Sequence, residues 1–166
     1  KSFPSPQLRL SNVRMNTTSK EINLNAEELI IYPKFTSFYN FKNLQVNKIK
    51  FKRNIVETDL ERMKNFFKLS VRFNKKFSFE DLDLKIKDKK MEIIDIKNIN
   101  FSNHGLRKNT IEGEVFSKKF KINLNKNLSQ MDFDLLNSGI SARLNLLSKK
   151  SEMSKIGKLK GKILDS

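Results

Sequence analysis

Apolar and polar residues alternate along most of this 166-residue sequence, which is the pattern of β-strands with one buried and one exposed face. Leu8 and Leu10, for example, alternate with Arg9 and Ser11. Comparable runs cover residues 8–15, 22–31, 44–51, 77–86, 91–101, 111–115, 120–124, 131–135 and 140–146, with a weaker one at 156–164. The sequence therefore predicts a mainly β chain.

In several runs the alternation shifts by one residue partway along. A shift would turn the side chains of a flat strand onto the wrong face, and a β-bulge absorbs the extra residue while bending the strand. The shifts fall between Leu10 and Val13, Ala26 and Leu29, Val46 and Ile49, and Phe79 and Leu82. They predict repeated bulges and a strongly curved sheet.

Short turn segments separate the later runs. Residues 87–90, 103–105, 125–127 and 137–139 are rich in Asn, Asp, Gly and Lys, and Asn and Gly tolerate the positive φ angles of tight turns. Connections this short join antiparallel neighbours, so we expect an antiparallel meander.

Two segments break the alternation and predict short helices at about 33–41 and about 59–69. Pro33 suits a first helical turn, and Thr58 with Glu61 forms a capping box. Because no Pro- or Gly-rich linker divides the chain, we expect a single β-rich domain over residues 1–166 with these two helical inserts. The chain begins at Lys1 and stops at Ser166 after an apolar run, and we interpret it as a piece of a longer protein.

The apolar face of such a sheet is larger than the helices that could cover it. Eight to ten strands of seven residues present roughly 800 Å² on one face. Two short helices cover roughly 300 Å². Either the sheet folds onto itself as a closed β-sandwich, or it forms an open groove that an apolar molecule other than protein fills.

Residue composition speaks against an enzyme. The chain has no cysteine, one histidine (His104) and five glycines, and it contains no nucleophile elbow and no phosphate-binding glycine loop. Glu80, Asp81 and Asp83 cluster in a way that could suggest a metal or general-acid site. Asp81 and Asp83 share a strand face with lysines of the neighbouring run, so we expect these two to pair across strands instead. His104 is interpreted as a turn residue in Asn-His-Gly. We therefore expect no catalytic residue, no metal and no cofactor.

The formal net charge of +16 raises the alternative of a basic β domain that binds nucleic acid or another acidic polymer. The positive charge comes from 27 lysines and only 7 arginines. Arginine is the residue that forms bidentate hydrogen bonds with phosphate and guanine. The lysines are spread along the chain rather than gathered in one stripe. We expect a solvated lysine-rich face and no specific nucleic-acid partner.

Residues 3–15 (FPSPQLRLSNVRM) resemble the start of the periplasmic part of AsmA-like bacterial envelope proteins, in which a proline precedes a first strand of the form L-x-L-x-x-V. Residues 26–31, 35–38 and 44–55 are similar to the strand, short helix and strand that follow in that family. Residues 111–124 are similar to a recurrent hairpin of the family. Asn54 stands where a proline is usual, and the resemblance covers residues 3–56 well and the remainder only generically.

The resemblance implies a periplasmic protein that a helix outside this segment anchors to the inner membrane. It also implies a β-sheet groove, a role in outer-membrane biogenesis, and lipid transport with phospholipid or another acyl lipid as the partner. It thereby favours a curved antiparallel meander with an open groove over the closed β-sandwich. The expected lining residues are apolar positions of the middle and later strands: Leu82, Leu84, Ile93, Ile122, Leu124, Phe133 and Leu144.

Overall fold

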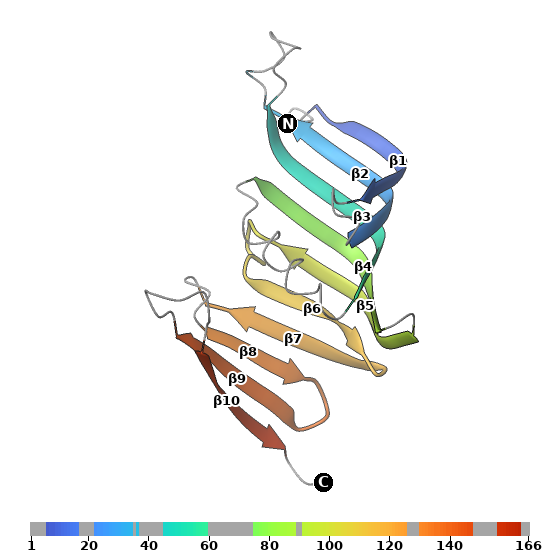
Figure 1. Ribbon diagram of the computed structural model, residues 1–166. Coiled ribbons are helices and arrows are strands. Elements are labelled where there is room, and N and C mark those ends of the chain that lie inside the picture. The colour runs from blue at the N-terminus through green and yellow to red at the C-terminus, as the bar shows by residue number, and fades with distance from the viewer. Residues whose placement is uncertain are drawn as a thin grey trace.

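A computed structural model describes residues 6–16, 22–34, 36, 45–59, 75–88, 91–125, 130–147 and 156–163. This part of the chain is mainly β and forms ten strands that lie side by side in chain order (Figure 1). The strands are β1 (Leu8–Asn16), β2 (Ile22–Pro33), β3 (Val46–Asp59), β4 (Lys76–Asp88), β5 (Met91–Ser102), β6 (Thr110–Val115), β7 (Lys118–Leu124), β8 (Gln130–Leu135), β9 (Ile140–Leu147) and β10 (Ile156–Ile163). All the strands expected from the alternation are present.

One pair of neighbours departs from the expected antiparallel meander. β3 and β4 are parallel, with Phe51 beside Phe79 and Val56 beside Leu84, whereas every other neighbouring pair is antiparallel. Parallel neighbours need a crossover of about a dozen residues or more. The chain between Asp59 and Lys76 is long enough for one, unlike a two-residue connection such as that between β6 and β7.

The ten strands form one open layer. β1 pairs with β2 and β10 with β9, and the two edge strands are not joined to each other within the described residues. The alternative of a closed β-sandwich is therefore wrong. The sheet is twisted but not strongly curled (Figure 1), so the expectation of strong curvature is also wrong.

Three of the four expected shifts in alternation coincide with skipped pairings that are aligned across the sheet. The shift expected between Val46 and Ile49 lies at a separate register shift beside Tyr32 and Pro33, and the aligned position of β3 is Arg53, which the alternation did not indicate. Asn12, Arg53 and Asp81 have φ angles of 54°, 49° and 54°, and each stands where the pairing skips one position. Glu27 is the skipped residue of β2. A bulge curves a strand when its neighbour lacks the extra residue. Here β1 to β4 each carry one at the same level, so their pairing stays in register and curvature does not build up.

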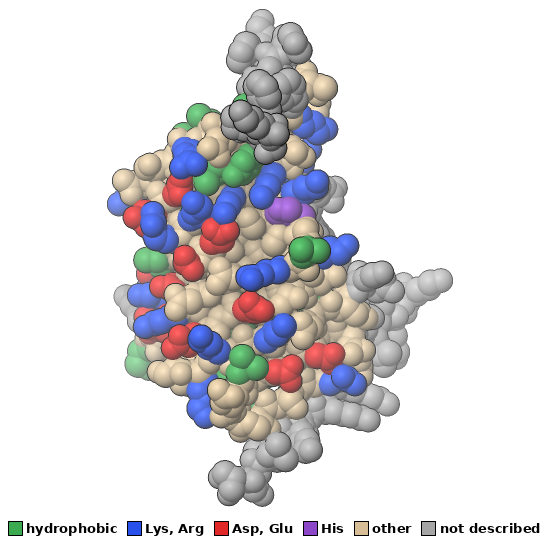
Figure 2. Space-filling view, turned by 180° about the vertical axis from the view of Figure 1, so that it is seen from behind, with side chains coloured by type: hydrophobic (Ala, Val, Ile, Leu, Met, Phe, Trp, Pro, Cys, Tyr) green, Lys and Arg blue, Asp and Glu red, His purple; other side chains and the backbone are tan. Residues whose placement is uncertain are grey.

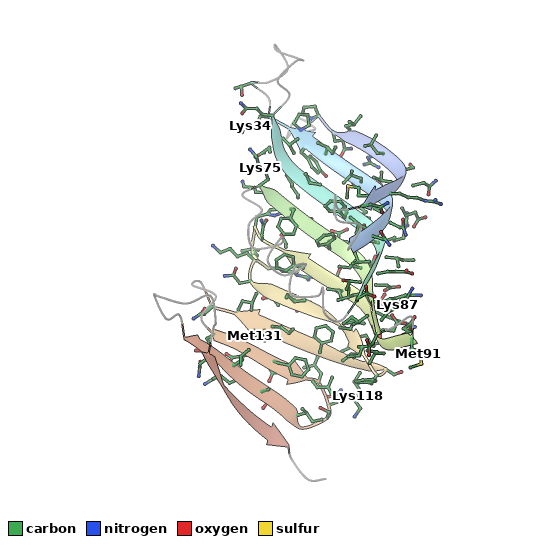
Figure 3. All side chains as sticks on the ribbon, viewed as in Figure 1. Lys34, Lys75, Lys87, Met91, Lys118 and Met131 are labelled. Atoms are coloured by element: carbon green, nitrogen blue, oxygen red, sulfur yellow. The ribbon has the colours of Figure 1, made fainter. Side chains whose placement is uncertain are left out.

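Apolar side chains share one face of this sheet. Because paired residues of neighbouring strands point to the same side, the register defines a continuous apolar row that crosses nine strands. The row comprises Leu10, Leu29, Phe51, Phe79, Phe101, Ile111, Ile122, Phe133 and Ala142. Figure 3 shows rings and aliphatic side chains along this face. We call it the apolar face.

The opposite face carries interleaved lysines, arginines, aspartates and glutamates (Figure 2). Many of them pair across strands, as Lys50 does with Glu80 at 2.5 Å and Lys52 with Glu28 at 3.1 Å. We call it the charged face. The separation of the two faces, with exceptions such as Ile30 and Ile55 on the charged face, is what the alternation in the sequence encodes.

The two expected helices fall largely outside the described residues. The strands extend to Pro33 and to Asp59, so neither residue begins a helix. Residues 35, 37–44 and 60–69 are not described, and the parts of the chain that are described contain no α-helix. Among them there is accordingly no helix with the length and hydropathy needed to cross a bilayer.

Candidate lipid-binding face

Four of the seven expected lining residues come together on neighbouring strands near the C-terminal end of the sheet. Ile122 of β7 is paired with Phe133 of β8. Met131 of β8 is paired with Leu124 of β7 on one side and with Leu144 of β9 on the other. All are half-buried. We call the set Ile122, Leu124, Met131, Phe133, Ala142 and Leu144 the C-terminal patch.

Leu82 and Leu84 lie on the same face but in a different environment. Their exposed fractions are 3% and 4%, and they form a cluster with Val56, Ile86 and Ile99 that is equally buried. Side chains this buried form packed core and offer no surface to a ligand. The structure therefore places these two expected lining residues in the core.

Ile93 is not on the apolar face. Its neighbour Ile94 pairs with Ile86 and packs against the buried cluster, while Ile93 is 46% exposed. A register shift between Ile86 and Lys87 determines which of the two consecutive isoleucines faces the core. The sequence offers both, so the assignment of Ile93 to the lining is wrong.

Aromatic contacts that were not predicted from the sequence stabilise the apolar face. Phe51 and Phe79 stack with ring centroids 4.9 Å apart, and Phe120 stacks on Phe133 at 6.1 Å. Stacked pairs contribute about 0.5–1.5 kcal/mol beyond the area that they bury. The short turn between β7 and β8 could have revealed the second pair, because it sets the register between those strands. The first pair depends on a parallel register that the sequence does not define.

Gly113 of β6 allows the Phe120 ring to reach its buried position. A Cβ atom at Gly113 would lie 2.8 Å from Cε1 of Phe120 and 3.1 Å from the backbone oxygen of Lys97. The absence of a side chain there leaves room for the ring, which is 5% exposed. The apolar face is thus closely packed where β6 meets β7.

Asn54 is the polar exception in the core. It is 1% exposed, and its Nδ2 donates a hydrogen bond to the backbone oxygen of Glu80 at 3.3 Å. Its Oδ1 has no hydrogen-bond partner among the residues that the structure describes. It follows directly after the aligned extra residue Arg53. Its side chain therefore bonds β3 to β4 at the level where both strands skip a pairing.

The acidic cluster is structural. Glu80 is in the ion pair with Lys50, and Asp83 Oδ1 accepts a hydrogen bond from the backbone nitrogen of Asn98 at 3.0 Å. Asp81 is the extra residue of β4. Among the described residues, the lysine partner in this cluster belongs to Glu80. Asp83, for which pairing with a lysine was expected, bonds to backbone instead, and Asp81 occupies the position that the pairing skips.

His104 lies in the loop between β5 and β6, as the sequence indicated. Its Nδ1 is 3.0 Å from Ser102 Oγ, and burial is the main cause that lowers its pKa below the ordinary value. The adjacent Asn103 accepts a hydrogen bond from the backbone nitrogen of Phe77 at 2.8 Å. These contacts fasten the loop to the start of β4.

The charged face has an open hollow of about 360 Å³ beside this loop. Polar groups from β4, β5, β6 and the loop line it, among them Ser78, Glu80, Asn100, Ser102, Arg107 and Glu112. Glu80 pairs with Lys50, and Glu112 lies 3.7 Å from Lys121. Both acids are therefore engaged with cations of the same face.

Pairing also determines the electrostatics of the charged face elsewhere. A hydrogen bond from Lys52 is the main cause that lowers the pKa of Glu28, and one from Arg143 lowers the pKa of Asp132. The face thus alternates in sign rather than forming a single basic stripe. A phosphate backbone is bound by a continuous basic surface, and this arrangement does not favour it.

Comparison with protein-family models, with curated proteins and with solved structures finds no match for this chain.

Proposed function

We propose that this protein is a non-catalytic, AsmA-like module that binds phospholipid acyl chains on its apolar face, with the C-terminal patch as the contact surface. The observation that carries the proposal is the continuous apolar row from Leu10 to Ala142. The row runs perpendicular to the strands, which is the direction in which a linear apolar molecule meets the largest number of strands.

The dimensions suit an acyl chain. The three strands β7 to β9 that carry the C-terminal patch extend over roughly 15 Å at about 4.8 Å spacing, similar to the roughly 15 Å of the acyl layer of one bilayer leaflet. Each buried methylene contributes about 0.8 kcal/mol before ordering costs, so half of a long acyl chain would provide several kcal/mol. Half-buried residues such as Leu124 and Leu144 retain surface for this contact.

The resemblance of residues 3–56 to AsmA-like proteins supports the cellular setting. On that basis we propose a periplasmic location, an inner-membrane anchor outside this 166-residue segment, and a part in outer-membrane biogenesis and lipid transport. A chain with net charge +16 is also complementary to anionic phospholipid headgroups.

Binding of nucleic acid through the lysines is the alternative that the test must separate. Pairing of the lysines with acids, as in Lys50–Glu80 and Lys52–Glu28, counts against it. Phosphate binding would weaken steeply as salt rises, whereas acyl-chain binding would depend little on salt.

The decisive substitution is Ile122→Asp, which introduces a charge into the C-terminal patch at a half-buried position. We expect it to abolish the lipid that co-purifies with the protein, as measured by mass spectrometry of solvent extracts. Lys121→Gln is the matched control, because the neighbouring side chain lies on the charged face. It should leave the lipid content nearly unchanged.

Leu144→Asp tests the same patch from β9 and should behave like Ile122→Asp. Circular dichroism of each variant establishes that the sheet is retained. If the folded wild-type protein carries no lipid and a photo-crosslinker at position 122 captures none in cells, the proposal is wrong.

A further inference from the structure

The hairpin between β6 and β7 has an apolar residue at its tip where a small polar one is expected. Phe116 and Ser117 form a two-residue turn with φ angles of 50° and 58°. Turns of this kind favour Asn and Gly, because positive φ crowds a bulky side chain. Phe116 is nevertheless 78% exposed. Neither backbone geometry nor packing within the described residues explains a phenylalanine here.

More exposed apolar side chains lie at the same end of the sheet. Leu136, 45% exposed, begins the turn between β8 and β9, and its backbone nitrogen donates to the oxygen of Lys119 at 2.8 Å, so the two turns are neighbours. Met91, 74% exposed, begins β5 after the preceding hairpin and points outward beside Lys87 (Figure 3). This end of the sheet therefore presents apolar side chains at three successive turns.

Lysines flank the tip of the β6–β7 hairpin. Lys118 and Lys119 are exposed and directly follow the turn. Of the two acids of the hairpin, Glu114 is half-buried opposite Lys119, and Glu112 lies farther from the tip, beside Lys121. Asp88 and Glu92 lie at the other hairpin, near Met91. The positive charge therefore concentrates around Phe116, on a chain that is strongly basic overall.

We propose that the tip of the β6–β7 hairpin docks onto an anionic lipid bilayer. Phe116 enters the interface between headgroups and acyl chains, assisted by Leu136, and Lys118 and Lys119 contact the headgroups. An aromatic ring on a narrow protruding turn fits between lipids, and basic residues beside it complement anionic headgroups. The alternative is that Phe116 binds in a pocket of another protein. Such binding would not depend on anionic lipid, so the vesicle experiment distinguishes the two.

The site lies on the rim of the sheet and is separate from the C-terminal patch. The two proposals can therefore fail independently. Ile122→Asp is expected to lose co-purifying lipid while its binding to vesicles is retained.

Vesicle flotation tests the docking directly. The purified chain should float with vesicles of phosphatidylethanolamine and phosphatidylglycerol and bind phosphatidylcholine vesicles far less. Phe116→Asn should weaken binding about tenfold, because the ring no longer leaves water. Asn accepts positive φ, so the hairpin of this variant should form at least as well as that of the wild type.

The matched control comes from the opposite end of the sheet. Leu106, in the loop between β5 and β6, is fully exposed and precedes Arg107 and Lys108. Leu106→Ser should leave vesicle binding unchanged. Replacing Lys118 and Lys119 by Gln should weaken binding to the anionic vesicles about fivefold for each lysine, whereas replacing Arg107 and Lys108 by Gln should have little effect.

Three outcomes would overturn the proposal. One is a wild-type chain that does not float with anionic vesicles. Another is equal binding by the wild type and the Phe116→Asn variant. The third is a loss for Leu106→Ser as large as that for Phe116→Asn, because attraction would then be general. If a crosslinker at position 116 captures a protein and the wild-type chain does not bind vesicles, the proposal is likewise overturned.

Discussion

The strands β2 to β5 and the strands β6 to β9 follow the same alternating pattern but differ in burial. The first group has strands of 12, 14, 13 and 12 residues, and Val56, Leu84 and Ile86 are between 0% and 4% exposed. The second group has strands of six to eight residues, and among its described side chains only Phe120 is buried. One half of the apolar face is thus a core, and the other half retains accessible surface.

This difference in burial indicates which part of the sheet retains apolar surface for a ligand. Alternation tells which side chains share a face, but it does not tell how closely that face is covered. The charged face does not share the difference, because cross-strand ion pairs occur in both groups, as in Lys52–Glu28 and Arg143–Asp132. Ligand binding is therefore proposed for β7 to β9, and a structural role for the centre of β3 and β4.

The largest effect that distinguishes the two groups is the cost of removing a leucine. Leu84→Ala should lower the free energy of unfolding by about 2–5 kcal/mol, because it leaves a cavity in a buried cluster. Leu144→Ala should cost clearly less, because Leu144 is half-buried. Urea unfolding of both variants measures the difference, and equal costs would contradict the division into core and accessible surface.

A smaller effect is expected where the two groups meet. Gly113→Ala should lower stability by about 1–3 kcal/mol, because the new Cβ would meet the Phe120 ring and the backbone oxygen of Lys97. Thermal unfolding followed by circular dichroism measures this cost. Gly105→Ala, with φ of +78° and no atom within 4 Å of the new Cβ, serves as control for backbone strain without a clash. A neutral Gly113→Ala variant would mean that Phe120 is not confined.

The smallest effect concerns the charged face. A carboxyl whose pKa is lowered by folding stabilises the fold above its ordinary pKa, and this contribution disappears as the pH falls through the lowered value. Arg143 lowers the pKa of Asp132 in this way. Arg143→Gln should therefore raise that pKa toward its ordinary value and leave the lowered pKa of Glu28 unchanged. Carboxyl titration by NMR tests both, and a change at Glu28 would show that the two regions are coupled.

The sequence predicted the described strands and most of the residues that share the apolar face. Period-two alternation is a local property, and Ile122, Leu124, Phe133 and Leu144 follow from it without knowledge of the fold. Ile93 was assigned wrongly because two isoleucines are adjacent, and only the register with Ile86 selects Ile94. The helices expected near 33–41 and 59–69 lie mostly outside the described residues, while β2 and β3 extend to Pro33 and Asp59.

The chain by itself thus determined a β architecture with one apolar and one charged face, because each strand carries that information in its own residues. Three features depend on long-range contacts instead: β3 and β4 are parallel, the sheet stays open and only moderately curved, and Leu84 is core while Leu144 remains accessible. Parallel pairing depends on a long crossover, and curvature depends on whether extra residues such as Asn12, Arg53 and Asp81 align. Burial depends on the packing of the whole layer, which no single strand encodes.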